Sequence, residues 1–166
     1  MHRTKLFILL FWTSLLAGCW SSSAEYAGIK LPQTTDSKVT FQEEGVPPSC
    51  NAFAHLLMNS KMHSTGKDIA SAMHKEAEDK GANLVLVGIS REMPDEELQE
   101  NKFDYYGPEY AYSFQKTWLG WKFGFDEWDE AGSLTNLGVD SWGNGNITYD
   151  NSLIIQAVFL KCDQAL

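Results

Sequence analysis

The segment from residue 51 to residue 90 constrains the fold most, because its hydrophobic pattern changes twice. Residues 51–58 (NAFAHLLM) form a short apolar run after a proline pair, which predicts a strand. Residues 83–90 (NLVLVGIS) form a continuous run of strand length rich in leucine and β-branched residues, which is typical of a central strand. The segment between them has helical spacing. The pattern therefore predicts a β-α-β unit, which normally has parallel strands.

The predicted helix has signals at both ends. Apolar residues recur at helical spacing from Ile69 to Ala77 and give a narrow stripe that can pack on a sheet. Thr65 followed by Asp68 matches a variant of the capping box. Gly81 is the type of residue that ends a helix in a left-handed conformation. We therefore expect one amphipathic helix in this unit.

Two further segments complete the expected sheet. Residues 153–160 (LIIQAVFL) predict a buried strand, and the alternation in residues 38–42 predicts a short edge strand. The fold class we predict is α+β: a small mixed sheet with one packed helix, built from the β-α-β unit and a C-terminal strand. Residues 91–150 would form a long aromatic-rich insertion in this single domain, which spans residues 38–166.

The insertion contains 13 of the chain's 21 aromatic side chains. Two interpretations stay open. The aromatic side chains can form a second layer over the sheet, since each buries about 150–250 Å². They can instead form an exposed surface that stacks on sugar rings, because tryptophan and tyrosine are enriched at binding interfaces. The residues we single out for ligand binding are Trp118, Trp121 and Trp128.

The N-terminus has the three parts of a secretory signal, which we assign to residues 1–18. Two basic residues precede the apolar run 6–16, which is too short to span about 30 Å of hydrocarbon. The tetrad that follows, Leu-Ala-Gly-Cys, resembles the lipobox of bacterial lipoproteins. That resemblance implies that Cys19 is the lipidated N-terminus, carrying acyl chains such as palmitate. Trp20 stands where an aspartate would retain a lipoprotein in the inner membrane, so the resemblance implies the outer membrane.

Residues 19–37 are small and polar, and we predict that they form a flexible tether. Removal of the signal takes two basic residues from the 13 basic and 22 acidic side chains, so the mature charge is −11. This charge repels nucleic acid and gives no attraction to anionic lipid. The expected partner is therefore the membrane, reached through the N-terminal acyl chains, which anchor stably when two or more are present.

Without Cys19, two cysteines remain, Cys50 and Cys162. In an exported domain this even number predicts one disulfide. The two residues can meet only if the strand after Cys50 and the strand before Cys162 run antiparallel and close together. Two buried free thiols, or a metal site with two thiolates, are the alternatives.

The segments AHLLM, GKDIASAMHKEAEDKGANLVLVG and IIQAVFLKC resemble small proteobacterial envelope lipoproteins. The stress-sensor lipoprotein of the Rcs system shares this outline, although it has two disulfides and lacks the aromatic insertion. The stretch YGP…GWKFGF…W is similar to envelope lipoproteins without an assigned activity. The resemblance implies a protein on the periplasmic side of the outer membrane.

No pattern in the sequence indicates catalysis. There is no GxSxG motif, no glycine-rich phosphate loop and no HExxH motif. We therefore predict no catalytic residues, no metal site and no cofactor. The expected function is a non-enzymatic binding or structural module of the cell envelope. The alternatives are a peptidoglycan- or glycan-binding domain that uses exposed aromatic residues, and an envelope-stress sensor that contacts partner proteins.

Overall fold

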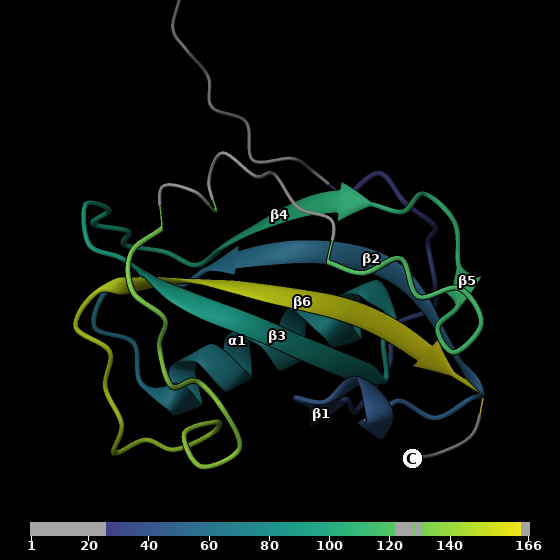
Figure 1. Cartoon of the computed structure of the whole chain (residues 1–166), viewed down its shortest axis with the longest axis horizontal. Helices are drawn as coiled ribbons and strands as arrows, with labels where there is room; N and C mark the ends of the chain where they lie inside the picture. Colours follow the sequence, from purple (N-terminus) through teal and green to yellow (C-terminus); the bar gives the residue numbers. More distant parts are fainter. Residues whose placement is uncertain (1–25, 122–127, 129–130, 164–166) are drawn as a thin grey trace, which may run out of the picture.

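The computed structural model describes residues 26–121, 128 and 131–163 (Figure 1). One helix packs on one face of a mixed six-stranded sheet, so the predicted α+β class is confirmed. The elements are β1 (Lys38–Thr40), a short 3-10 helix (Glu43–Gly45), β2 (Cys50–Asn59), α1 (Gly66–Lys80), β3 (Leu84–Met93), β4 (Lys102–Gly107), β5 (Tyr112–Ser113) and β6 (Ser152–Cys162).

The sheet has the order β1-β3-β6-β2-β4, with β5 paired to β2 outside this path. Both β2 and β3 run antiparallel to β6, so they are parallel to each other, as the β-α-β pattern predicts. They are not neighbours, because β6 lies between them. This long apolar strand forms ladders with both, which makes it the centre of the sheet (Figure 1).

Helix α1 begins and ends at the predicted signals. The Thr65 side chain accepts a hydrogen bond from the Asp68 backbone N–H, and the Asp68 side chain accepts one from the Thr65 N–H. At the other end Gly81 has a φ of 87°. In this left-handed conformation its N–H bonds to carbonyls of the last helical turn, and a glycine adopts it without steric cost.

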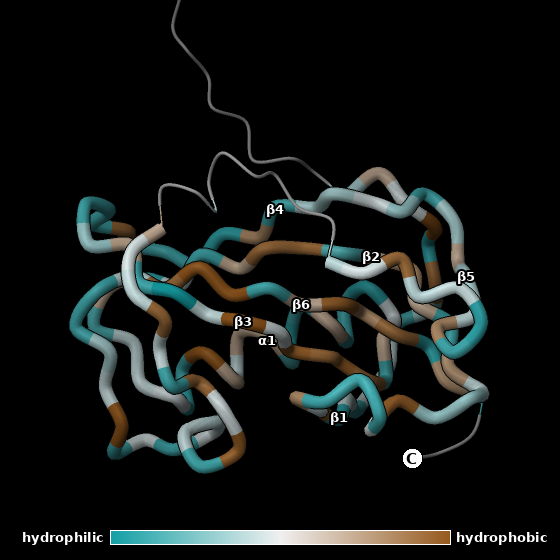
Figure 2. The backbone as a smooth tube through the Cα atoms, viewed as in Figure 1, coloured by the Kyte–Doolittle hydropathy of each residue, from teal (hydrophilic) through white to brown (hydrophobic). Residues whose placement is uncertain are grey.

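The side chains of β6 alternate between two buried faces. Leu153, Ile155 and Phe159 point to the side covered by α1, and we call this side the helix face. Ile154 and Leu160 point to the opposite side. Hydrophobic residues dominate along β2, β3 and β6 in Figure 2, as strands buried on both sides require.

The insertion 91–150 contributes to the sheet as well as to its cover. It contains β4 and β5, which both pair with β2. Its described aromatic residues lie on both sides of the sheet. Four pack against the helix-face core: Phe103, Tyr105, Trp142 and Tyr149. Six belong to clusters on the opposite side, which we call the aromatic face: Tyr106, Tyr112, Phe114, Trp118, Trp121 and Trp128.

The predicted disulfide is present between Cys50 and Cys162. These residues are directly opposite each other in the antiparallel ladder of β2 and β6. The geometric condition derived from the sequence is therefore met. The bond closes a loop of 112 residues at one end of the sheet.

Residues 26–37 correct the extent of the predicted tether. Instead of standing away from the domain, Tyr26, Ile29 and Leu31 pack against the helix-face core. The Thr34 N–H also donates to the Glu78 carbonyl at 3.1 Å. The segment is polar overall, and its three apolar side chains are not spaced with the period of a helix or a strand. The sequence therefore contains no sign that they pack on the domain. The remaining part of the predicted tether, residues 19–25, lies outside the described residues, as does the signal segment 1–18.

Candidate functional site

A cavity of about 490 Å³ lies where the described chain enters the domain. Its size is in the range of small-ligand sites. Residues 26–28 form one wall, and residues 105–109, at the end of β4, form the other. The lining side chains include three tyrosines and one charged residue: Tyr26, Tyr105, Tyr106 and Glu109, together with Ala27 and Pro108.

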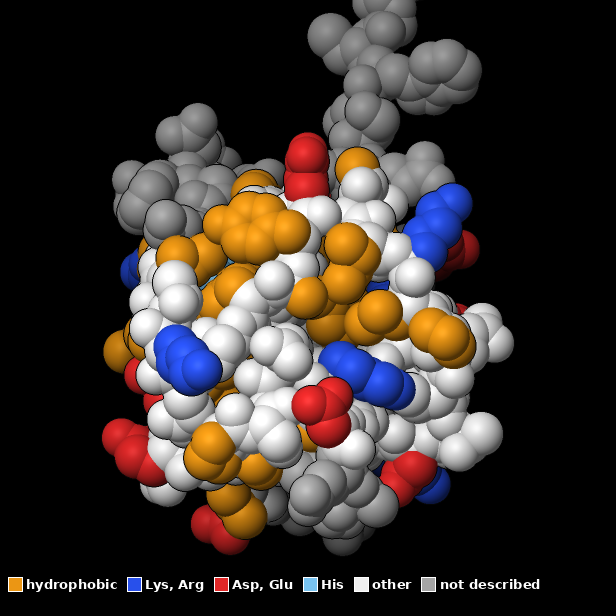
Figure 3. Space-filling view, turned by 90° about the vertical axis from the view of Figure 1, so that its right-hand side faces the viewer, with side chains coloured by type: hydrophobic (Ala, Val, Ile, Leu, Met, Phe, Trp, Pro, Cys, Tyr) orange, Lys and Arg blue, Asp and Glu red, His pale blue; other side chains and the backbone are white. Residues whose placement is uncertain are grey.

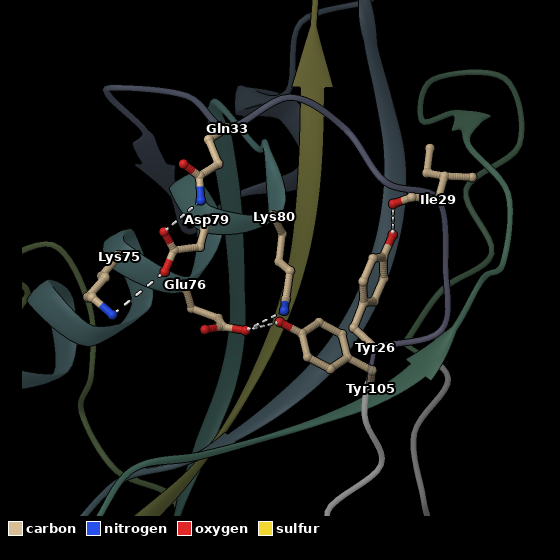
Figure 4. Close-up of polar contacts among 8 residues, drawn as sticks. All are labelled: Tyr26, Ile29, Gln33, Lys75, Glu76, Asp79, Lys80 and Tyr105. Carbon is tan, nitrogen blue, oxygen red and sulfur yellow. Dashed lines mark hydrogen bonds and ion pairs between the residues drawn. The ribbon is translucent and has the colours of Figure 1, made fainter.

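Tyr105 connects the cavity to helix α1. Strand β4 directs its ring to the helix face, where the hydroxyl donates a 2.6 Å hydrogen bond to Glu76 Oε1. Lys80 Nζ lies 3.4 Å from the same carboxylate oxygen, one helical turn further on (Figure 4). The ammonium group also lies 5.6 Å from the centre of the Tyr105 ring and 5.7 Å from that of Tyr26, within the range of cation–π attraction.

Tyr26 is held in place by a ring contact and a hydrogen bond, in addition to the Lys80 ammonium group. Its ring centre is 4.9 Å from that of Tyr105, with the planes tilted by 56°. Its hydroxyl donates a 2.8 Å hydrogen bond to the Ile29 carbonyl (Figure 4). Both tyrosine hydroxyls are therefore engaged within the domain, and the rings form rigid walls.

The pKa values of these two phenols are raised. Burial raises the pKa of Tyr105 well above its ordinary value, and its hydrogen bond to the Glu76 carboxylate raises it further. Burial also raises the pKa of Tyr26. Both hydroxyls therefore keep their protons at physiological pH, and they donate them to the Ile29 carbonyl and to Glu76.

The three tryptophans predicted to bind a ligand are half-buried on the aromatic face. Trp118 packs on Phe114, with ring centres 4.5 Å apart, and meets the Trp121 ring edge-on at 5.4 Å. Trp128 packs against a neighbouring cluster that Trp121 also contacts, and the Arg91 guanidinium is 5.4 Å from the Trp128 ring centre. The structure thus brings two of the three rings into contact. Their role in ligand binding stays a prediction.

A buried polar pair lies beneath these tryptophans. His55 on β2 is 2 % exposed, and its Nε2 is 2.8 Å from the Tyr112 hydroxyl. The imidazole also stacks on Trp118 at a centroid distance of 5.7 Å. Burial raises the pKa of Tyr112 to about 12. The hydroxyl stays protonated, and the pair is a hydrogen-bonded contact within the core.

His74, Ser37 and Glu78 lie close together, but their hydrogen bonds argue against nucleophilic catalysis. The Trp142 indole N–H donates to His74 Nε2 at 3.3 Å, which leaves the proton of a neutral imidazole on Nδ1. That Nδ1–H then donates to Ser37 Oγ at 2.7 Å, and the serine hydroxyl donates to Glu78 at 3.3 Å. The histidine is therefore a donor to the serine and cannot take its proton.

A second, smaller groove of about 330 Å³ lies beside β1, and Trp142 is one of the residues that line it.

Within the described residues no group of three or more histidine, cysteine, aspartate or glutamate side chains could hold a metal ion. A search of the same residues for helices found none with the length and hydropathy to cross a bilayer. The predicted lipidation site, Cys19, lies outside the described residues.

The cavity residues were not predicted from the sequence, because Tyr26 falls in the polar segment assigned to the tether. The Tyr105-Tyr106-Gly107-Pro108 stretch was noted only as part of the aromatic insertion. Comparisons with family models, curated proteins and solved structures found no match to this chain.

Proposed function

We propose that this chain is a lipid-anchored protein of the bacterial cell envelope and that its domain is a non-enzymatic binding module. It would be attached through acyl chains on Cys19 to the outer membrane and face the periplasm. The tyrosine-lined cavity is the best candidate for its binding site, because rigid aromatic walls suit recognition of a ligand.

The observation that carries the proposal is the pairing of Cys50 with Cys162. The chain has three cysteines, so this disulfide leaves Cys19 as the one remaining thiol. Structural disulfides are typical of exported proteins, because the cytosol keeps thiols reduced. The remaining thiol belongs to the Leu-Ala-Gly-Cys tetrad after an apolar segment of signal-peptide length. Disulfide and tetrad together support an exported lipoprotein.

The test is the covalent state of the chain when all 166 residues are produced in a Gram-negative host. We expect an intact mass equal to residues 19–166 plus a diacylglycerol and an amide-linked acyl chain, and recovery in the outer-membrane fraction. Cys19→Ser should remove the lipid mass and the membrane attachment. The matched control, Cys50→Ser with Cys162→Ser, should keep both. An unprocessed chain without acyl groups in the cytosol would overturn the proposal.

A further inference from the structure

The point where the chain enters the domain sets how the domain can lie on a membrane. Tyr26 is fixed by its ring contact with Tyr105 and by its hydrogen bond to Ile29, so the chain belongs to the domain from this residue on. We propose that the tyrosine-lined cavity faces the bilayer that holds the Cys19 acyl chains, and that the tyrosines around it contact lipid headgroups. This inference rests on the proposed lipid anchor.

The first argument is reach. Seven residue steps separate Cys19 from Tyr26, and even a fully extended chain spans at most about 3.6 Å per residue, or about 25 Å here. A compact domain of this length has a radius of gyration of about 14 Å, which corresponds to a sphere about 37 Å across. The Tyr26 end cannot point away from the membrane, because the connection would then have to cross the whole domain.

The second argument is that the cavity and the long loops lie at opposite ends of α1. Tyr26 and Tyr105 contact Lys80, the last residue of the helix. At the other end, the Gly143 N–H donates to the carbonyl of Gly66, the first residue. The 15-residue helix is about 22 Å long at 1.5 Å per residue. The loop around Gly143 is therefore on the side away from the bilayer.

The third argument is the chemistry of the surface at this end. Tyr110 is 59 % exposed, and Tyr106 and Pro108, which precede it in the chain, are half-buried. Figure 3 shows hydrophobic side chains gathered in the upper half of the end of the molecule that carries β5. Among the residues that line the cavity, Glu109 is the one with a charged side chain. Tyrosine is enriched at membrane–water interfaces, where its ring meets lipid and its hydroxyl meets water.

The experiment places the lipidated protein in phosphatidylcholine nanodiscs that contain a small fraction of lipid with a paramagnetic headgroup. Intact mass first verifies the acyl chains. We expect amide signals of residues 26–28, 105–107, 109 and 110 to lose at least half of their intensity, and those of residues 138–143 to be unchanged. Equal broadening at both ends, or stronger broadening at 138–143, would overturn the inference. An unacylated chain would instead contradict the proposed function, so the two failures are distinguishable.

One insertion and one pair of substitutions sharpen this test. Insertion of twenty glycine and serine residues after Ser23 extends the reach to about 97 Å, so the difference between the two ends should shrink. Tyr110→Ser should weaken the broadening of residues 105–107 and 109, because the exposed ring is removed. Leu134→Ser is the matched control, since Leu134 is 70 % exposed and lies on another loop. Equal effects of these two substitutions would contradict the headgroup contact.

Discussion

The two faces of the sheet are built differently. On the helix face, α1 covers an apolar core in which the largest side chains, Phe53 and Phe159, are fully buried. On the aromatic face, half-buried tryptophans from the insertion cover a core that also contains polar side chains. His55 and Gln156 are 2 % and 6 % exposed there.

The two faces differ in how the layer that covers each of them, helix α1 or the aromatic segment, is positioned on the sheet. An amphipathic helix forms with its apolar side chains already aligned, so it packs on a sheet as one unit. The segment over the aromatic face has little regular structure among its described residues, apart from the two-residue strand β5. Its rings are positioned one by one, by Phe114, by Arg91 and by the bare backbone of Gly88. The helix face should therefore contribute more to stability for each side chain removed.

The largest expected effect compares one ring from each face. Phe53→Ala should lower the free energy of unfolding by about 3–5 kcal/mol, because it leaves a cavity in a closed core. Trp118→Ala should cost only about 1–2 kcal/mol, because the ring is half-buried and water can fill part of its place. Denaturant titrations measure both values. Equal losses would show that the two faces are packed alike.

A smaller effect is expected where Trp121 meets the sheet. A Cβ atom added to Gly88 would lie 2.7 Å from the Trp121 ring, so the ring has to move. Gly88→Ala should cost about 1–3 kcal/mol and shift tryptophan fluorescence to longer wavelength. At Gly138 a Cβ meets nothing within 4 Å. Gly138→Ala is therefore the matched control and should change stability by less than about 0.5 kcal/mol. If Gly88→Ala left the free energy of unfolding unchanged, Trp121 would not be in contact with Gly88.

The smallest effect concerns the capping box of the helix face. Thr65→Ala should cost about 1 kcal/mol, because the Asp68 N–H loses its acceptor. Hydrogen bonds from the Thr65 backbone and hydroxyl lower the pKa of Asp68. Its carboxylate therefore stabilises the fold above the ordinary aspartate pKa, and this contribution is lost as the pH falls through the lowered pKa.

The free energy of unfolding, measured as a function of pH, tests whether this contribution is lost in acid. The gap between the wild type and Thr65→Ala should narrow in acid, where the protonated Asp68 no longer accepts both hydrogen bonds. Asp68→Asn, which cannot titrate, should show less loss of stability on acidification than the wild type. A gap that widens in acid would contradict the capping account.

The sequence predicted the helix face closely, because its signals are local. The cap at Thr65, the stripe from Ile69 and the glycine at 81 act within a few residues of one another, and α1 lies between them. The cysteine count and the strand patterns also predicted the antiparallel approach of Cys50 and Cys162.

Tertiary structure alone decided the rest, because those features depend on contacts between residues far apart in the chain. Hydrophobic periodicity shows that a strand is buried but not which strand lies beside it, so the position of β6 between β2 and β3 was not predictable. Composition shows that a segment is aromatic but not which side of each ring meets water. Tyr26 was assigned to the tether because the composition of its segment does not show which residues its ring contacts. Only its contacts with Tyr105 and Lys80, about 80 and 54 residues away, make it a wall of the cavity.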